Sequence, residues 1–258
     1  MSSFKFRPSL ESLDARLTPS VTVVQVANEL VITGDKDPDV VRLFDNGQGQ
    51  VSGFATGVGF FVKNGIEKIT VNTEGGDDNV EYSLTDYLHA GQQQKVYVGL
   101  GSNFDPNPGN DRFYANLQDK SLAGGSRLDI SADGGGGDDS LFVNARNLGV
   151  RPTAVLKNTI VGGFGNDTLA QLYSGVDQGT VTMRTHGQEG NDLIRQEMSF
   201  FAGSTGATAG WVTGGEGDDQ VSLYMYPTTT MTVVLAQVEG NAGTDFVNFN
   251  APIVTGIP

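Results

Sequence analysis

The chain has 258 residues, which suits one or two globular domains or a single elongated all-β unit. It carries 16 Lys and Arg against 30 Asp and Glu, and the formal net charge of -14 favours a cation as partner and argues against nucleic acid and anionic membrane surfaces. It has no cysteine, which excludes disulfides and zinc–thiolate sites, and no run of about 18 apolar residues, so we expect no membrane insertion.

The first 20 residues differ in pattern from the rest of the chain. Leu10, Leu13 and Leu17 recur at a helical spacing and Pro19 ends the pattern, which predicts a short N-terminal helix. The segment lacks the apolar core of a cleavable signal peptide. We therefore divide the chain into an N-terminal segment, residues 1–20, and a repeat domain, residues 21–258.

From residue 21 onward the pattern is that of short β-strands. Runs such as Leu30, Val31 and Ile32 are rich in β-branched residues, and clusters of Gly, Asp and Asn separate one run from the next. Hardly any stretch has a helical period. The domain is therefore predicted to be all-β.

An internal repeat organises this domain. Seven segments share the order Gly, then Asp, Asn or Thr, then Asp, any residue and an apolar residue. Their shared Asp residues are separated by 33, 28, 28, 25, 27 and 26 positions, and a poorer copy precedes them at residues 34–40. A period of about 28 residues indicates a solenoid.

Each repeat has the pattern of a strand, a Gly/Asp turn, a second strand and a looser connection. One such unit cannot bury its apolar face alone, whereas stacked coils can. The predicted fold is a single-stack parallel β-helix, or β-solenoid, with coils of about 28 residues and a short N-terminal helix; a β-sandwich, which also has regular turns, is the alternative. One apolar residue per repeat would then form an inward ladder: Val80, Phe113, Leu141, Leu169, Ile194, Val221 and Val247.

Three copies extend to the nonapeptide G-G-x-G-x-D-x-U-x, in which U is a large apolar residue: residues 134–142, 162–170 and 214–222. This pattern resembles the haemolysin-type, or RTX, calcium repeat. The resemblance implies a glycine-rich turn followed by a short strand, with calcium held between stacked turns by Asp carboxylates and turn carbonyls. Family repeats follow one another in tandem, whereas here each stands alone, so the turns would line one edge of the stack only.

The resemblance implies calcium ligands at the shared Asp of each repeat, and at the Asp that precedes it in two repeats. The candidate metal-binding residues are Asp78, Asp111, Asp138, Asp139, Asp167, Asp192, Asp218, Asp219 and Asp245. The copies around Asp78, Asp111, Asp192 and Asp245 are weaker equivalents because they have lost some or all of the upstream glycines.

Charge repulsion independently favours a cation. Stacked coils would place the shared Asp residues about 5 Å apart, where two charges repel by roughly 1 kcal/mol at the dielectric of water and about 3 kcal/mol at an effective value of about 20. A fold stable by about 5–15 kcal/mol does not tolerate six such contacts. Calcium accepts irregular oxygen cages better than magnesium does. The alternative is a metal-free ladder in which Asp side chains accept hydrogen bonds from turn amides.

Residues 10–19 are similar to the L-E-x-L-E/D-x-R-x-x-P segment that opens many surface and secreted proteins of planctomycete bacteria. The matching residues are Leu10, Glu11, Leu13, Asp14, Arg16 and Pro19. The similarity implies export, and hence an extracellular or cell-surface location in a bacterium, with residues 1–20 as an export or attachment segment. An ordinary amphipathic helix is the alternative.

The sequence therefore predicts a calcium-binding, non-catalytic, secreted or cell-surface scaffold, with calcium, and polysaccharides or other surface proteins, as partners. Its Gly-rich loops lack the Lys of a phosphate loop, and no G-x-S-x-G sequence is present. The alternative is a calcium-dependent carbohydrate-active enzyme or carbohydrate-binding module on a β-helix. Its candidate site is the longest interval between repeats, with Tyr82, Asp86, Tyr87, His89, Lys95 and Tyr97.

Overall fold

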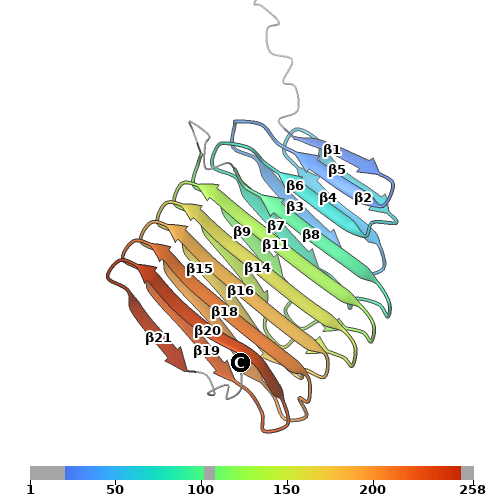
Figure 1. Ribbon diagram of the computed structural model, residues 1–258. Helices are drawn as coiled ribbons and strands as arrows, with labels where there is room; N and C mark the ends of the chain where they lie inside the picture. Colours follow the sequence, from blue (N-terminus) through green and yellow to red (C-terminus); the bar gives the residue numbers. More distant parts are fainter. Residues whose placement is uncertain (1–20, 102–107, 251–258) are drawn as a thin grey trace, which may run out of the picture.

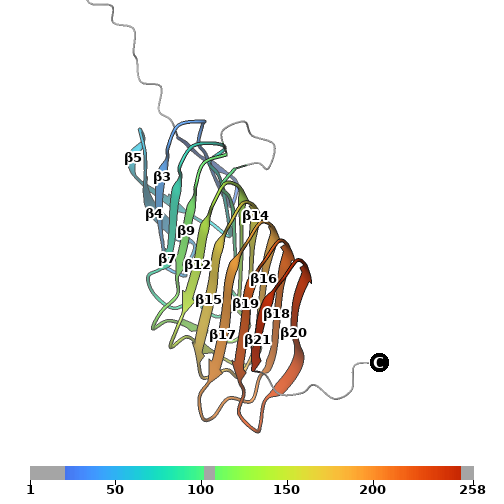
Figure 2. The same ribbon diagram turned by 90° about the vertical axis from the view of Figure 1, so that its left-hand side faces the viewer.

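The computed structural model describes residues 21–101 and 108–250, and within these ranges every regular element is a β-strand. The strands form two large sheets that face each other and extend along the length of the molecule (Figure 1, Figure 2). The described ranges contain no helix with the length and hydropathy needed to cross a membrane. The helix predicted for residues 10–17 lies outside the described residues.

The first sheet, sheet A, faces the viewer in Figure 1 and contains nine strands. In spatial order they are β1 (Thr22–Val26), β2 (Glu29–Thr33), β6 (Lys68–Asn72), β8 (Gln93–Gly99), β11 (Arg127–Gly136), β14 (Val155–Phe164), β16 (Thr180–Glu189), β18 (Ala207–Glu216) and β20 (Thr232–Ala242).

The second sheet, sheet B, contains ten strands, and a small third sheet contains two. The strands of sheet B are, in spatial order, β21 (Phe246–Asn250), β19 (Gln220–Tyr226), β17 (Leu193–Phe200), β15 (Thr168–Gly175), β12 (Ser140–Ala145), β9 (Arg112–Asn116), β7 (Asn79–Leu84), β3 (Val40–Asp45), β4 (Gln50–Ala55) and β5 (Gly59–Asn64). The third sheet pairs two connections, β10 (Ser121–Leu122) and β13 (Gly149–Val150).

The chain winds in coils, each with one strand in sheet A, a turn at the shared Asp, one strand in sheet B and a connection back. Neighbouring coils pair as parallel strands, from β2–β6 and β3–β7 to β18–β20 and β19–β21. The predicted β-solenoid, with about seven coils, is therefore confirmed, and the fold is not the alternative β-sandwich.

The predicted inward ladder is also confirmed. Its seven residues pair in register from one coil to the next, beginning with Val80 against Phe113 and ending with Val221 against Val247. Six of them are at most 1% exposed, whereas Val247 is 44% exposed. Val247 differs because no described coil lies beyond β21.

Alternation along the strands divides each sheet into a buried and a solvent-facing side. In β18, for example, Thr208 and Val212 are fully buried while Trp211 and Thr213 lie on the outer face. The outward positions can therefore carry polar and aromatic side chains without disturbing the core.

Antiparallel hairpins cover the first parallel coil. β1 pairs antiparallel with β2, and β3, β4 and β5 form an antiparallel meander in sheet B. Solenoids need such atypical terminal units because an exposed coil would present unpaired strand edges.

The inward ladder leads to a prediction about stability. Leu141→Ala, whose side chain is fully buried between Phe113 and Leu169, should lower the free energy of unfolding by about 2–5 kcal/mol in urea denaturation. Leu193→Ala is the matched control: Leu193 is 51% exposed on the outer face, so its loss should change stability by about 0.5 kcal/mol or less. Equal losses would contradict the ladder.

Candidate functional site

The shared Asp of every repeat lies in the turn between a strand of sheet A and the next strand of sheet B, as Asp139 does between β11 and β12. Because the coils stack in register, these turns lie side by side along one edge of the molecule (Figure 1). The fold therefore brings together Asp residues that are far apart in sequence.

The shared Asp side chains form a continuous ladder, which we call the inner ladder. Asp139 Oδ1 accepts a hydrogen bond from the main-chain N–H of Asp111 at 2.7 Å, and Asp167 Oδ1 accepts one from the N–H of Asp139 at 2.8 Å. The same bond links each successive pair in the series Asp39, Asp78, Asp111, Asp139, Asp167, Asp192, Asp219 and Asp245. The turns thus have the amide-bonded ladder that the sequence left open as the alternative to calcium.

The residue before each shared Asp belongs to a second ladder, the outer ladder, which runs in the opposite direction. Asp138 Oδ1 accepts the N–H of Asn166 in the following coil at 2.7 Å. The outer ladder contains, in order, Asp77, Asn110, Asp138, Asn166, Asn191, Asp218 and Thr244. No two Asp residues are neighbours in this order, so the exposed ladder avoids adjacent charges, whereas the inner ladder has Asp in every coil.

Close stacking of the turns explains the glycine two residues before each shared Asp. Gly165 has a φ of 127°, and a Cβ there would lie 2.0 Å from the carbonyl oxygen of Gly137 in the preceding coil. The equivalent glycines, from Gly109 to Gly243, meet the preceding coil in the same way. Only glycine allows this approach, so the turn requires it with or without a metal.

The other carboxylate oxygen of the inner ladder, Oδ2, faces a main-chain oxygen. Asp139 is 2% exposed, and a Cβ on Gly134 would lie 2.3 Å from Asp139 Oδ2 and 2.4 Å from the carbonyl oxygen of Gly162 in the next coil. The same arrangement recurs at the next three coils. Among the described residues, no hydrogen-bond partner reaches the Oδ2 atoms of Asp111, Asp139, Asp167, Asp192 and Asp219.

Burial disfavours the charged form of these carboxylates. Desolvation raises the pKa of Asp111 and Asp139 to about 8 and that of Asp167 to about 7, and neighbouring Asp carboxylates raise each pKa further, against the opposing effect of the bound N–H. The pKa of Asp192 is raised to about 6 for the same reasons. Two buried oxygens facing each other without a hydrogen between them need a proton or a cation.

Calcium suits the oxygen donors of this edge, since its ligands in proteins are carboxylates and main-chain carbonyls. In the described part of the chain, no three His, Cys, Asp or Glu side chains converge on one point. A cation here would therefore be held by carboxylates of successive coils together with turn carbonyls.

The nine Asp residues predicted from the sequence divide between the two ladders. Seven lie in the inner ladder, whereas Asp138 and Asp218 lie in the outer ladder and are exposed. The sequence did not single out Asp39, the first member of the inner ladder. Gly34, five residues before it, was the available signal, because Gly134 precedes Asp139 by the same interval.

The structure separates the residues of the alternative carbohydrate site. Tyr82 is fully buried in the core, and Tyr97 lies 40% exposed on β8 of sheet A. Tyr87 and His89 stack on each other, with 4.1 Å between their ring centroids, in the loop between β7 and β8. These side chains do not form one site.

Comparison with known proteins adds no assignment. No protein family, curated protein or solved structure matches this chain. The function has to be inferred from the geometry of the turns and the faces of the sheets.

The stacked glycines can be tested with a matched pair of substitutions. Gly165→Ala and Gly65→Ala both place a Cβ at a positive φ, but only the Cβ at position 165 meets another coil, since that at position 65 has no atom within 4 Å. Gly65→Ala should lower the free energy of unfolding by about 1 kcal/mol, and Gly165→Ala by about 3 kcal/mol or more, in urea denaturation. Equal effects would show that the turns do not stack this closely.

The inner ladder also predicts a pH dependence. Its Asp residues have a pKa of about 6 to about 8 when folded, against about 3.9 in the unfolded chain. The folded state binds more protons, so this stabilisation is complete below about pH 4 and is lost as the pH rises through about 6 to 8. In EDTA, the midpoint of thermal unfolding should be higher at about pH 5 than at about pH 8. A midpoint that rises over this range would rule out buried carboxylates without partners.

Proposed function

We propose that this protein is a non-catalytic repeat scaffold that binds calcium along the inner ladder. The supporting observation is the column of buried Oδ2 atoms, which face main-chain oxygens and have no hydrogen-bond partner among the described residues. Near neutral pH the column needs positive charge. The ion pairs of the described residues involve none of the five Asp residues from Asp111 to Asp219 that carry these atoms.

The donor atoms favour calcium over other cations. Oδ1 of each inner-ladder Asp is already bonded to an amide, which leaves Oδ2 and the carbonyl oxygen of the first glycine in the next coil. Calcium accepts six to eight oxygens in flexible arrangements, whereas magnesium requires near-ideal octahedral geometry. The same column would hold protons instead at lower pH.

Calcium would contribute directly to folding. The chain has no cysteine and therefore no disulfides, and the free energy of binding a cation to the folded state adds to its stability. A chain of this kind would be least stable where calcium is scarce and most stable where it is abundant. That behaviour suits an exported scaffold at the cell surface or in the extracellular medium, as the N-terminal segment implies.

The calcium proposal predicts a shift in thermal stability. Millimolar calcium, at about pH 8, should stabilise the protein by about 3 kcal/mol when its concentration is about a hundredfold above Kd, and magnesium should do so less. Far-UV circular dichroism would follow the unfolding in EDTA, in calcium and in magnesium. Equal midpoints in all three would mean that the ladder is neutralised by protons alone.

Two matched variants assign the effect to the inner ladder. Asp139→Asn keeps an oxygen that can accept the amide hydrogen bond but removes the buried charge, so it should reduce the calcium-induced shift and raise stability in EDTA. Asp138→Asn removes one charge from the exposed outer ladder and should leave the shift unchanged. An equal reduction by both variants would point to non-specific binding on an acidic surface.

A further inference from the structure

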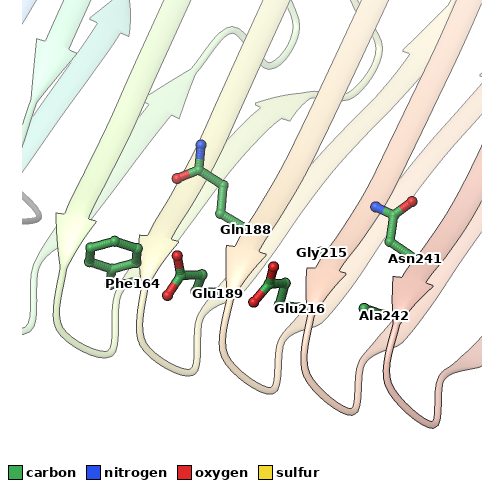
Figure 3. A pocket seen from close by; sticks show the side chains of 7 residues that line it. All are labelled: Phe164, Gln188, Glu189, Gly215, Glu216, Asn241 and Ala242. Carbon is green, nitrogen blue, oxygen red and sulfur yellow. The ribbon is translucent and has the colours of Figure 1, made fainter.

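A shallow cleft of about 510 Å³ lies beside the same turns, at the ends of β14, β16, β18 and β20 (Figure 3). Its lining residues are Phe164, Gln188, Glu189, Gly215, Glu216, Asn241 and Ala242. Strand register arranges them in two columns, one with Phe164, Glu189, Glu216 and Ala242 and one with Gln188, Gly215 and Asn241. None of these side chains takes part in the inner or outer ladder.

The cleft carries uncompensated negative charge. Glu189 and Glu216 are exposed and lie on neighbouring coils, about 4.8 Å apart along the stack. Figure 3 shows their carboxylates side by side on adjacent strands. No ion pair of the described residues involves either of them, and like charges directly opposite each other destabilise a sheet. A ligand with two positive charges at the spacing of the coils would relieve this repulsion.

Two carboxamides border the carboxylates in a strained conformation. Gln188 and Asn241 have φ values of 89° and 73°, at a turn position where the complete nonapeptides have glycine. A side chain in this conformation costs about 1–2 kcal/mol. Each carboxamide offers both a donor and an acceptor beside the glutamates, which suits the hydroxyl groups of a ligand.

The outer face of sheet A continues the cleft with aromatic groups. Trp211 lies between the Arg184 guanidinium, 5.4 Å from the ring centroid, and the His186 ring, 5.8 Å between centroids. His186 is tied to Thr213 by a 2.8 Å hydrogen bond between Nδ1 and Oγ1. Desolvation and, less strongly, Arg184 lower the pKa of His186, so this ring is neutral near pH 7 and adds no positive charge to the face.

We propose that this face binds a chain of amino sugars that runs along the stack, with ring ammonium groups paired to Glu189 and Glu216. A β-1,4-linked hexosamine chain advances per ring by nearly the distance that separates two coils. An extended peptide instead repeats the side chains of one face every 6.6–6.8 Å or so, which matches the coil spacing less well. Hydroxyl groups of the sugar would contact Gln188 and Asn241, and its apolar ring faces would pack against Phe164 and Trp211.

The test compares two oligosaccharides that differ only in charge: the hexamer of β-1,4-linked glucosamine and its fully N-acetylated counterpart. Calorimetric titration in EDTA at about pH 6, where glutamate is ionised and the inner ladder holds protons, separates this proposal from the calcium proposal. The glucosamine hexamer should bind, and the acetylated hexamer should bind at least about tenfold more weakly because it lacks the ammonium groups. The fluorescence of Trp211, the one tryptophan of the chain, should change on binding.

Matched variants assign the binding to the cleft. Glu189→Gln and Glu216→Gln should each weaken binding of the glucosamine hexamer about threefold to fivefold, with unchanged circular dichroism. Glu74→Gln removes the same charge from the same edge near β6, outside the cleft, and should leave binding unchanged. Equal weakening by all three variants would overturn the proposal. So would failure of the glucosamine hexamer to bind, equal binding of the acetylated hexamer, or equally tight binding of a lysine hexapeptide.

Discussion

The hydrogen bond from the main-chain N–H of one shared Asp to the carboxylate of the next sets the geometry of the whole stack. It recurs from Asp39 to Asp245 and links every coil to its neighbour at the same turn. Such a bond requires the carboxylate to turn inward and the two main chains to approach closely. Glycine is therefore required in the turn, and the carboxylate becomes buried.

The same bond creates the electrostatic problem that defines the candidate site. One oxygen of each carboxylate is satisfied by an amide, while the other is left beside a carbonyl oxygen in a place that water does not reach. Amide bonds favour the ionised form, but desolvation and the next Asp outweigh them, so the pKa rises. A ladder of this kind is well satisfied in hydrogen bonds and poorly satisfied in charge. It therefore responds to protons and cations.

The outer surface of the turns follows different rules because it is wet. Asp alternates with Asn or Thr in the outer ladder, so that no neighbouring pair is doubly charged, and water screens the rest. In the cleft this restraint is abandoned, since Glu189 and Glu216 face the same side and two carboxamides replace glycines at positive φ. Departures from the local rules at one place on a regular scaffold are typical of binding sites.

Sequence alone determined the solenoid, the spacing of its coils and the inward ladder, because each repeat carries the same glycine and Asp at positions that only a recurring turn explains. It also located the seven shared Asp residues of the inner ladder. Only the tertiary structure decided that these carboxylates bond to amides of the preceding coil, and that Asp138 and Asp218 face outward, since side-chain direction depends on how two turns stack. Register between strands, which no local pattern contains, placed Glu189 beside Glu216 and Trp211 beside Arg184. Stacking therefore converts a repeated sequence into charged columns whose members are distant in the chain.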